Sequence, residues 1–399
     1  MQKMQELVNK LFATKRFNLI AYITIAALVL VAYSNTFTSA FHFDDNPSIV
    51  ENGSIRHLTW DSFVGQFSGT RPIVNLSLLF NYQLSGMNVV GWHIFNIGFH
   101  IANSIFVYLF ILWTLNLPSL HARYGGIRAK RIALFGSLLF ALHPIQTESV
   151  TYIISRTELI ATFFYLATFL FFIKGVRTRK VSYYIGCFFM SLLAMGSKEW
   201  AVTLPAMVFL YDFLFIAEGK LQTVLTRSMV YILIALPWGY VAYNLMSSKT
   251  SGAGFGISGQ NGITPLTYQL TSLNVLWTYI RLLICPINQN LDYTYPLAKT
   301  LFEFPTLLSL LGHVCVVAAS VWLYVKRKWT LLPFGAAWFY ITLSPTQSFV
   351  PILDVIFEHR LYLPSIGFVL VFILLFESFF DWFEKRKTLK TGNAVSYAS

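Results

Sequence analysis

The sequence has few charged residues. Asp, Glu, Lys and Arg make up 12% of its 399 residues, about half the share in an ordinary soluble domain. Hydrophobic residues account for 56%, aromatic residues for 17%, and the mean hydropathy is +0.59. This composition excludes a soluble globular domain and predicts an all-α polytopic membrane protein, whose helices satisfy their own backbone polar groups within lipid.

Cysteine is also scarce, and the acidic residues are outnumbered. The three cysteines, Cys187, Cys285 and Cys315, lie in or beside apolar runs without metal or redox spacing, so we interpret them as buried small hydrophobic residues. The net charge of +12 comes from short basic clusters between apolar runs rather than from a separate basic domain. That distribution disfavours nucleic-acid binding.

The N-terminal segment predicts a basic helix that lies on the cytoplasmic membrane surface. Met4, Leu7 and Leu11 recur at helical spacing, with lysines between them. A cleaved signal peptide is the rival interpretation, because residues 38–40 resemble a cleavage site. We expect the segment to be retained and the first span to follow at residues 18–33.

Residues 41–92 are predicted to form the first large external loop. Its segment around Trp60 and Phe63 is amphipathic, and a second run, 73–84, is too short and too polar to span. Both are expected to be helices in the outer interface, the second one starting at Arg71-Pro72. A Gly-rich stretch predicts a flexible external loop at about 248–265. We treat residues 1–399 as a single transmembrane domain.

Ten further stretches are candidates for spanning helices. Nine of them are near residues 93–116, 132–150, 157–173, 183–196, 200–216, 229–246, 306–325, 331–346 and 362–380. The tenth, 266–284, has a polar stripe opposite its apolar stripe and is ambiguous. If it does not span, the basic clusters at Lys326–Lys328 and at the C-terminus fall in the cytoplasm, as the positive-inside rule requires. We therefore predict about 10–11 transmembrane helices with both termini inside.

This topology places most of the remaining charged residues at the outer ends of spans. They can converge on one external cavity, and charges near a membrane are costly unless they are paired or functional. The candidate site residues are Asp44, Asp45, Arg71, His143, Glu148, Arg156, Glu158, Lys198, Glu199, His359 and Arg360.

An ordered set of motifs resembles the TMTC-type protein O-mannosyltransferases over nearly the whole chain. The motifs are Phe43-Asp44-Asp45, Arg71-Pro72, residues 91–96 with His100, residues 141–150, residues 155–159, Ser197-Lys198-Glu199 and residues 358–365. The resemblance implies a GT-C-like helical bundle with an acidic motif after the first span. It further implies an inverting mechanism and a polyprenyl-phosphate sugar donor used on the extracytoplasmic or lumenal face. The sequence shows no 34-residue period, so the resemblance does not extend to the tetratricopeptide arrays of the animal members.

Sugar transfer from a lipid phosphate requires a base and a set of cations. Asp44 or Asp45 can accept the proton of the acceptor hydroxyl, because adjacent carboxylates raise each other's pKa. Cations must hold the charge that grows on the departing phosphate, and Arg71, Arg156, Lys198 and Arg360 are the candidates.

Each of these residues also has a structural interpretation. The two aspartates could cap an interfacial helix, and His143-Pro144 could only bend a span. Glu148 could pair with Arg156 or Lys198 as a structural bridge. His93 and His100 lie on one helical face, but they are more often satisfied core residues than metal ligands. No cluster argues for a metal, so we assign no metal and no cofactor, although a divalent ion is not excluded.

The function expected from the sequence is transfer of mannose or another hexose to a hydroxyl of a protein or glycan. The enzyme is expected to be a multi-pass integral protein of a bacterial or archaeal plasma membrane or of the endoplasmic reticulum. The alternatives are a transporter, a lipid-linked glycan flippase or a glycan ligase. A transporter would place carboxylates near the midplane or show repeated halves, and a ligase would be expected to have a larger external domain.

Overall fold

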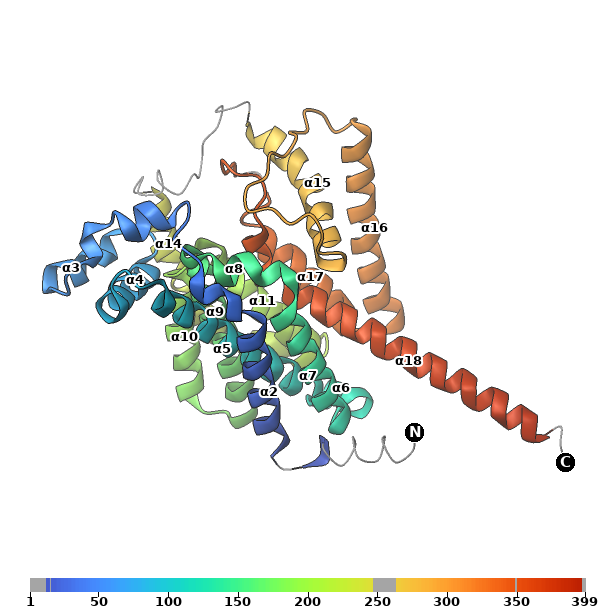
Figure 1. The fold of residues 1–399 in the computed structure, drawn as a ribbon. Helices are drawn as coiled ribbons and strands as arrows, with labels where there is room; N and C mark the ends of the chain where they lie inside the picture. The colour runs from blue at the N-terminus through green and yellow to red at the C-terminus, as the bar shows by residue number, and fades with distance from the viewer. Residues whose placement is uncertain (1–11, 15, 247–262, 349, 397–399) are drawn as a thin grey trace.

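The computed structural model describes residues 12–14, 16–246, 263–348 and 350–396, and the elements that they form are helices and short helical turns (Figure 1). The α-helices are α2 (Phe17–Ala32), α3 (Trp60–Gly65), α4 (Pro72–Ser85), α5 (Val89–Leu115), α6 (Pro118–Tyr124), α7 (Ile127–Leu142), α8 (Thr147–Thr151), α9 (Arg156–Thr178), α10 (Val181–Met195), α11 (Leu204–Tyr211), α12 (Leu221–Leu225), α13 (Ser228–Ala235), α14 (Trp238–Met246), α15 (Pro265–Ile284), α16 (Phe304–Arg327), α17 (Leu331–Leu343) and α18 (Ser365–Ser396). The expectation of an all-α polytopic membrane protein is confirmed.

Helices α5 and α9 form the centre of the bundle. α5 packs against α2, α4, α7 and α9, and α9 packs in turn against α10. Their contact with α11 and α17 is filled by aromatic rings: Phe110 lies 5.4 Å from Phe169 and 5.5 Å from Trp338 between ring centroids. Aromatic side chains bury much apolar area with few rotatable bonds, so this cluster gives the two central helices a fixed position.

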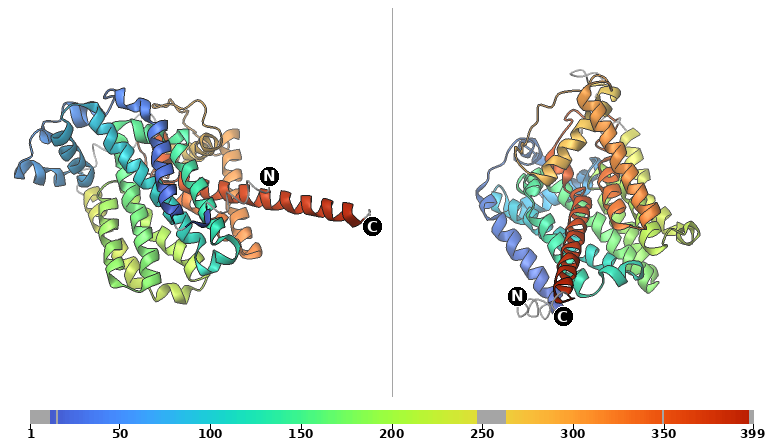
Figure 2. Two further views of the ribbon diagram at one scale, coloured as in Figure 1. Left: turned by 60° about the horizontal axis from the view of Figure 1, so that its bottom comes forward. Right: turned by 90° about the vertical axis from the view of Figure 1, so that its right-hand side faces the viewer.

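Helices α15 to α18 form the second part of the bundle. α15 packs against α16, α16 against α17, and α17 against α18. Only 11% of the most apolar stretch of α16 is buried, so its other side is available to lipid. α18 continues away from the bundle as a long extension (Figure 2).

Five segments within the described part of the chain are long enough and apolar enough to cross a membrane. They are Val89–Leu115, Ile153–Thr178, Glu199–Ile216, Phe304–Arg327 and Ser365–Trp382. Three shorter apolar helices, Phe17–Ala32, Val181–Met195 and Leu331–Leu343, coincide with further expected spans. The polytopic class is thus confirmed, while the number of 10–11 crossings stays a prediction.

Two expected spans are broken by prolines. The predicted helix at 132–150 ends at Leu142, because His143 takes an extended conformation with ψ 129° before Pro144. A proline disfavours the helical conformation of the residue before it. The predicted span at 229–246 is two helices, α13 and α14, separated at Leu236-Pro237. Apolar periodicity continues across both breaks and therefore conceals them.

The first external loop contains the two helices expected there, α3 and α4. Of the three cysteines expected to be buried, Cys187 is buried, whereas Cys285 and Cys315 are exposed. α15, the ambiguous segment with a polar stripe, is a helix of 20 residues that is not among the spanning candidates. That stripe faces α16, since Asn274 bonds to Thr306 and accepts a hydrogen bond from Ser309. The predicted N-terminal surface helix and most of the Gly-rich loop lie outside the described residues.

Replacing Gly367 by alanine is expected to destabilise the crossing of α17 and α18. A Cβ atom there would overlap the carbonyl oxygen of Gly335, and one on Gly335 would come within 2.7 Å of the carbonyl oxygen of Gly367. Such close helix crossings require small residues, and overpacking costs about 1–3 kcal/mol. The melting temperature of the purified protein in detergent should therefore fall.

Gly98→Ala is the matched control. A Cβ atom on Gly98 meets no other atom within 4 Å, so this variant should melt at or slightly above the temperature of the unchanged protein. Equal melting of Gly367→Ala and Gly98→Ala would contradict the close crossing.

Candidate active site

The two adjacent aspartates point in different directions. Asp45 is 1% exposed, and its carboxylate accepts hydrogen bonds from the backbone N–H groups of His42 (3.1 Å) and Ile154 (2.8 Å). Asp44 is exposed, and its backbone N–H donates to the hydroxyl of Tyr152 at 2.8 Å. Asp45 therefore ties the first loop to the segment before α9 and leaves the Asp44 carboxylate free to face outward.

Burial raises the pKa of Asp45, and the two backbone donors and Arg156 lower it by smaller amounts. Desolvation disfavours the charged form of a carboxyl group, while hydrogen bonds to the carboxylate favour it. The environment of Asp45 is thus that of an anchored, partly dehydrated carboxyl group.

Arg156 lies beneath this turn and does not line a cavity that we describe. It is 0% exposed and its guanidinium lies 4.9 Å from the ring centroid of Trp92 and 4.4 Å from that of Phe95. Its Nη2 donates to the side-chain oxygen of Asn81 at 2.9 Å. The cation–π contacts hold the guanidinium among these rings, and Arg156 is absent from the lining of the larger cavity.

Four titratable side chains form a continuous buried chain beside the turn. Glu148 accepts hydrogen bonds from the backbone N–H of His359 at 2.8 Å and from its ring Nδ1. The other ring nitrogen of His359 lies 4.0 Å from Glu158. Glu158 in turn pairs with Lys198 and accepts from the indole N–H of Trp200 at 2.8 Å. The chain connects α8, α9, the 198–200 segment and the turn before α18.

Glu148 and His359 both have shifted pKa values. Burial raises the pKa of Glu148 to about 7. Burial also lowers the pKa of His359 well below 6.5, and the nearby Lys198 lowers it further. Both shifts favour the neutral forms, because a low-dielectric environment penalises charge.

Two arginines complete the site in different ways. Arg71 binds Glu199 bidentately, with Nε–Oε1 and Nη2–Oε2 distances of 3.0 Å. Arg360 donates to the backbone carbonyl oxygen of Asp354 at 2.8 Å, and no carboxylate of the described residues forms an ion pair with it. The nearby Glu358 carboxylate accepts hydrogen bonds from the side chains of Gln289 and Tyr293 and from the backbone N–H of Asn290 instead. Arg360 also donates to the carbonyl oxygen of Val355 at 3.5 Å, so its partners in the described structure carry no formal negative charge.

A cavity of about 470 Å³ is lined by Asp44, by both arginines and by Lys198 and His359. Its polar lining comprises Asp44, Arg71, Tyr152, Lys198, Glu199, Asp292, Asp354, His359 and Arg360. A second cavity of about 310 Å³ is lined by Asp45, Glu148 and Glu358 and shares Tyr152 and Leu291 with the first. The turn at Asp44-Asp45 thus lies between two adjoining cavities, with one carboxylate toward each.

Three other predicted residues, Glu148, Glu158 and His143, do not line the larger cavity. Glu158 lies under Lys198, and Glu148 lies under His359 while lining the second cavity. His143 bonds to the carbonyl oxygen of Leu283 at 2.9 Å and accepts from the N–H of Ile145. It therefore holds the turn after α7.

Sequence reasoning missed three titratable cavity residues: Tyr152, Asp292 and Asp354. The motif that ends at Val150 stops two residues short of Tyr152, and both missed aspartates lie in irregular segments without a repeated pattern. In the described part of the chain, no group of three or more His, Cys, Asp or Glu side chains is arranged to hold a metal ion.

Comparison with known proteins shows three similar relatives over most of the chain. It is 24% identical over 426 residues to the Homo sapiens protein O-mannosyl-transferase TMTC4, an alignment that covers 92% of this chain and 57% of the relative. It is 26% identical to the Drosophila melanogaster protein O-mannosyl-transferase Tmtc3, with 90% and 46% covered. It is 25% identical to the Caenorhabditis elegans protein O-mannosyl-transferase F38B6.6, with 92% and 52% covered.

The predicted resemblance to the TMTC-type proteins is confirmed by these relatives. The chain spans about half the length of the curated relatives that it matches. No protein-family model and no solved structure matches the chain.

Replacing Glu148 by glutamine is expected to change how stability depends on pH. The pKa of this carboxyl is about 7 in the fold and 4.5 ordinarily. Between these values the fold holds a proton that the unfolded chain has lost, so the contribution of Glu148 to the free energy of unfolding falls as pH rises. The lowered pKa of His359 acts oppositely, because the unfolded chain binds more protons below pH 6.5. Glu148→Gln removes only the falling contribution.

The measurement is the melting temperature in detergent from pH 5 to pH 7. The difference between Glu148→Gln and the unchanged protein should grow in favour of the variant as pH rises. Glu51→Gln, which alters an exposed carboxylate of the first loop, should follow the unchanged protein. Parallel curves for Glu148→Gln and the unchanged protein would refute the raised pKa.

Proposed function

We propose that this TMTC-like chain is a GT-C-type membrane glycosyltransferase that moves a sugar from a polyprenyl phosphate to a hydroxyl group of an acceptor protein. The similar relatives are named protein O-mannosyl-transferases, which favours mannose as the sugar. The observation that carries the proposal is the placement of the Asp44 carboxylate in one cavity with Arg71, Lys198, His359 and Arg360.

The proposed reaction is a single inverting displacement at the anomeric carbon. The acceptor oxygen forms a bond to that carbon as the bond to the phosphate oxygen breaks. The hydroxyl proton passes to the Asp44 carboxylate, and the bonding electrons leave with polyprenyl phosphate. A base and a cationic pocket on opposite sides of the sugar are what this displacement requires, and no cofactor beyond the lipid-linked donor is needed.

Asp44 fits the base better than Asp45 does. The Asp45 carboxylate is occupied by the N–H groups of His42 and Ile154 and is buried. The Asp44 side chain lines the larger cavity, and its position is fixed through the bond between its own N–H and Tyr152. We assign Asp45 a positioning role.

Arg360 is the proposed main ligand of the donor phosphate. Its guanidinium lies 5.3 Å from the ring centroid of Phe357 and makes no ion pair with a carboxylate in the described part of the chain. Arg71 and Lys198 are already paired with Glu199 and Glu158, so they contribute positive charge with a fixed geometry. Arginine binds phosphate oxygens bidentately, which holds the leaving group in line.

The second cavity is the proposed path for the acceptor. It adjoins the larger one at Tyr152 and Leu291 and carries Asp45, Glu148 and Glu358 but no lysine or arginine. A neutral or basic acceptor segment suits this lining, while the phosphate of the donor suits the cationic lining of the larger cavity.

An extracytoplasmic active site follows from the charge distribution. The cavity lies at the ends of the helices where α9 and α17 meet the 198–200 and 345–360 segments. The basic residues Arg177, Arg179 and Lys326 lie at the other end of α9 and of α16. Because basic clusters mark the cytoplasmic side, we place the reaction on the opposite side of a multi-pass membrane protein.

Asp44→Asn should lower the rate of sugar transfer by roughly 10²-fold or more, because asparagine cannot accept the hydroxyl proton. The assay supplies polyprenyl-phosphate mannose and an acceptor polypeptide to the purified enzyme and follows labelled product. Binding of the donor should change little, since Asp44 carries no positive charge. Asp61→Asn, which alters another aspartate of the first external loop, is the control and should retain activity. Full turnover of Asp44→Asn would remove Asp44 as the base.

Arg360→Gln should raise the KM for the donor and lower kcat, because Arg360 is proposed to bind the phosphate both before and during cleavage. The loss in kcat/KM should be roughly 10²-fold or more. Arg281→Gln is the matched control, since this exposed arginine lies on α15 and is absent from the cavity lining. A donor KM and kcat equal to those of the unchanged enzyme would refute the role of Arg360.

A further inference from the structure

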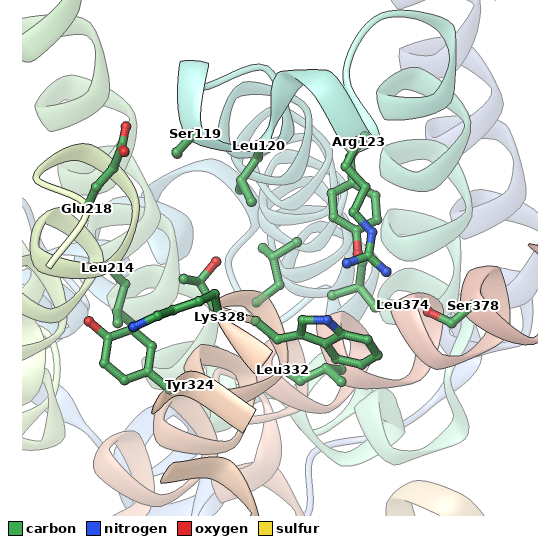
Figure 3. Close-up of a pocket in the computed structure, with 14 residues that line it drawn as sticks. Ser119, Leu120, Arg123, Leu214, Glu218, Tyr324, Lys328, Leu332, Leu374 and Ser378 are labelled. Carbon is green, nitrogen blue, oxygen red and sulfur yellow. The ribbon is translucent and has the colours of Figure 1, made fainter. Parts of the chain in front are cut away.

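A third cavity, of about 310 Å³, lies at the opposite end of the bundle from the proposed active site (Figure 3). It is formed where α6, the end of α16, the start of α17 and the middle of α18 meet. None of its lining residues belongs to either cavity at the Asp44-Asp45 turn. It is therefore a separate site.

Two cations line this cavity without a counter-ion. No ion pair with a carboxylate is formed by Arg123 or Lys328 in the part of the chain that the structure describes. The guanidinium of Arg123 lies 5.1 Å from the ring centroids of both Tyr124 and Trp329. The aromatic rings fix this guanidinium without consuming its hydrogen-bond donors. Glu218 is the one acidic residue of the lining, and in Figure 3 it lies across the cavity from Arg123.

The backbone adds to the positive potential. α17 begins at this cavity with Leu331, and Thr330 before it makes no capping hydrogen bond with its side chain. The first N–H groups of a helix have no partner within the helix and carry partial positive charge. Together with Arg123 and Lys328, they make the cavity suitable for an anion.

The rest of the lining and its surroundings are apolar. Leu120, Leu214, Leu332 and Leu374 line the cavity. Val317 and Val321 of α16 are exposed and lie on the same face of this helix as the lining residues Tyr324 and Lys328. A cationic cavity beside an exposed apolar helix face matches a molecule with an anionic head and hydrocarbon chains.

We propose that this cavity binds the phosphate group of an anionic membrane lipid, with Arg123 and Lys328 supplying the positive charge and the exposed face of α16 receiving the acyl chains. Basic pockets between membrane helices on the basic side of a protein have the chemistry that such head groups require. The site is independent of the proposed glycosyl transfer, and its occupancy can be measured without an activity assay.

The test measures lipid retention on the purified full chain by native mass spectrometry. Phosphatidylglycerol and phosphatidylcholine are offered in detergent at equal concentration, and inorganic phosphate is offered alone as a third arm. Phosphatidylglycerol should be retained and should raise the melting temperature. Arg123→Gln with Lys328→Gln should lose roughly 25-fold in affinity, since each cation is worth about fivefold, or about 1 kcal/mol.

A second variant separates binding from folding. Lys328 has a φ of 55°, a left-handed conformation that glycine adopts without strain. Lys328→Gly removes the charge while relaxing the backbone, so it should lose lipid and keep or raise the melting temperature without lipid. Lys326→Gln with Arg179→Gln is the matched control, because both residues are basic and exposed near the same end of the bundle but do not line the cavity.

Three outcomes would overturn the proposal. Equal retention of phosphatidylcholine, whose choline cancels the charge of its phosphate, would show that the site does not select a lipid with a net negative charge. Equal loss in the control double variant would assign binding to the overall charge of this end. Stabilisation by inorganic phosphate alone to the same extent as by phosphatidylglycerol would show that the ligand is a free anion rather than a lipid.

Discussion

The mutual neutralisation of Glu158 and Lys198 is the interaction on which the proposed site depends. Glu158, in the first turn of α9, is buried, and a lone buried carboxylate would be strongly disfavoured. Lys198 reaches it from the segment between α10 and α11. Removing either partner would leave an uncompensated buried charge. The pair therefore fixes the distance between two helix ends, and His359, Glu148 and the bidentate pair of Arg71 with Glu199 are arranged around it.

Asp44 and Asp45 have different surroundings because only one of the two carboxylates is hydrogen-bonded inside the protein. Asp45 enters the protein because two backbone N–H groups are available to it, and those donors would otherwise have to be satisfied in another way. Neighbouring side chains of a tight turn cannot both enter the same pocket, so Asp44 faces the adjoining cavity. A pair that looks symmetrical in sequence thus divides into an anchor and an exposed group.

The sequence predicted the class, most helices and the gathering of distant charges, because each depends on composition or periodicity. Arg71, Lys198, His359 and Arg360 do line one cavity, as expected from their places at the outer ends of spans. Arg156 could not be placed in this way. Whether an arginine at a helix start faces the cavity or lies against Trp92 and Phe95 depends on rings contributed by another helix. The prolines at 144 and 237 break helices whose apolar pattern continues, and Tyr152, Asp292 and Asp354 enter the cavity from irregular segments without a recognisable pattern.

The two ends of the bundle hold their cations differently, in a way that fits the two proposed roles, sugar transfer at one end and lipid binding at the other. At the proposed active site, Arg71 and Lys198 are held by carboxylates, so their geometry is set before a ligand enters. Preorganised charge is effective for a transition state because little rearrangement is needed when charge develops. At the opposite end, Arg123 rests on aromatic rings and Lys328 ends a helix, with no carboxylate paired to either in the described structure. An anion that stays bound and does not react needs no such preorganised pairing, which suits the lipid proposed for this cavity.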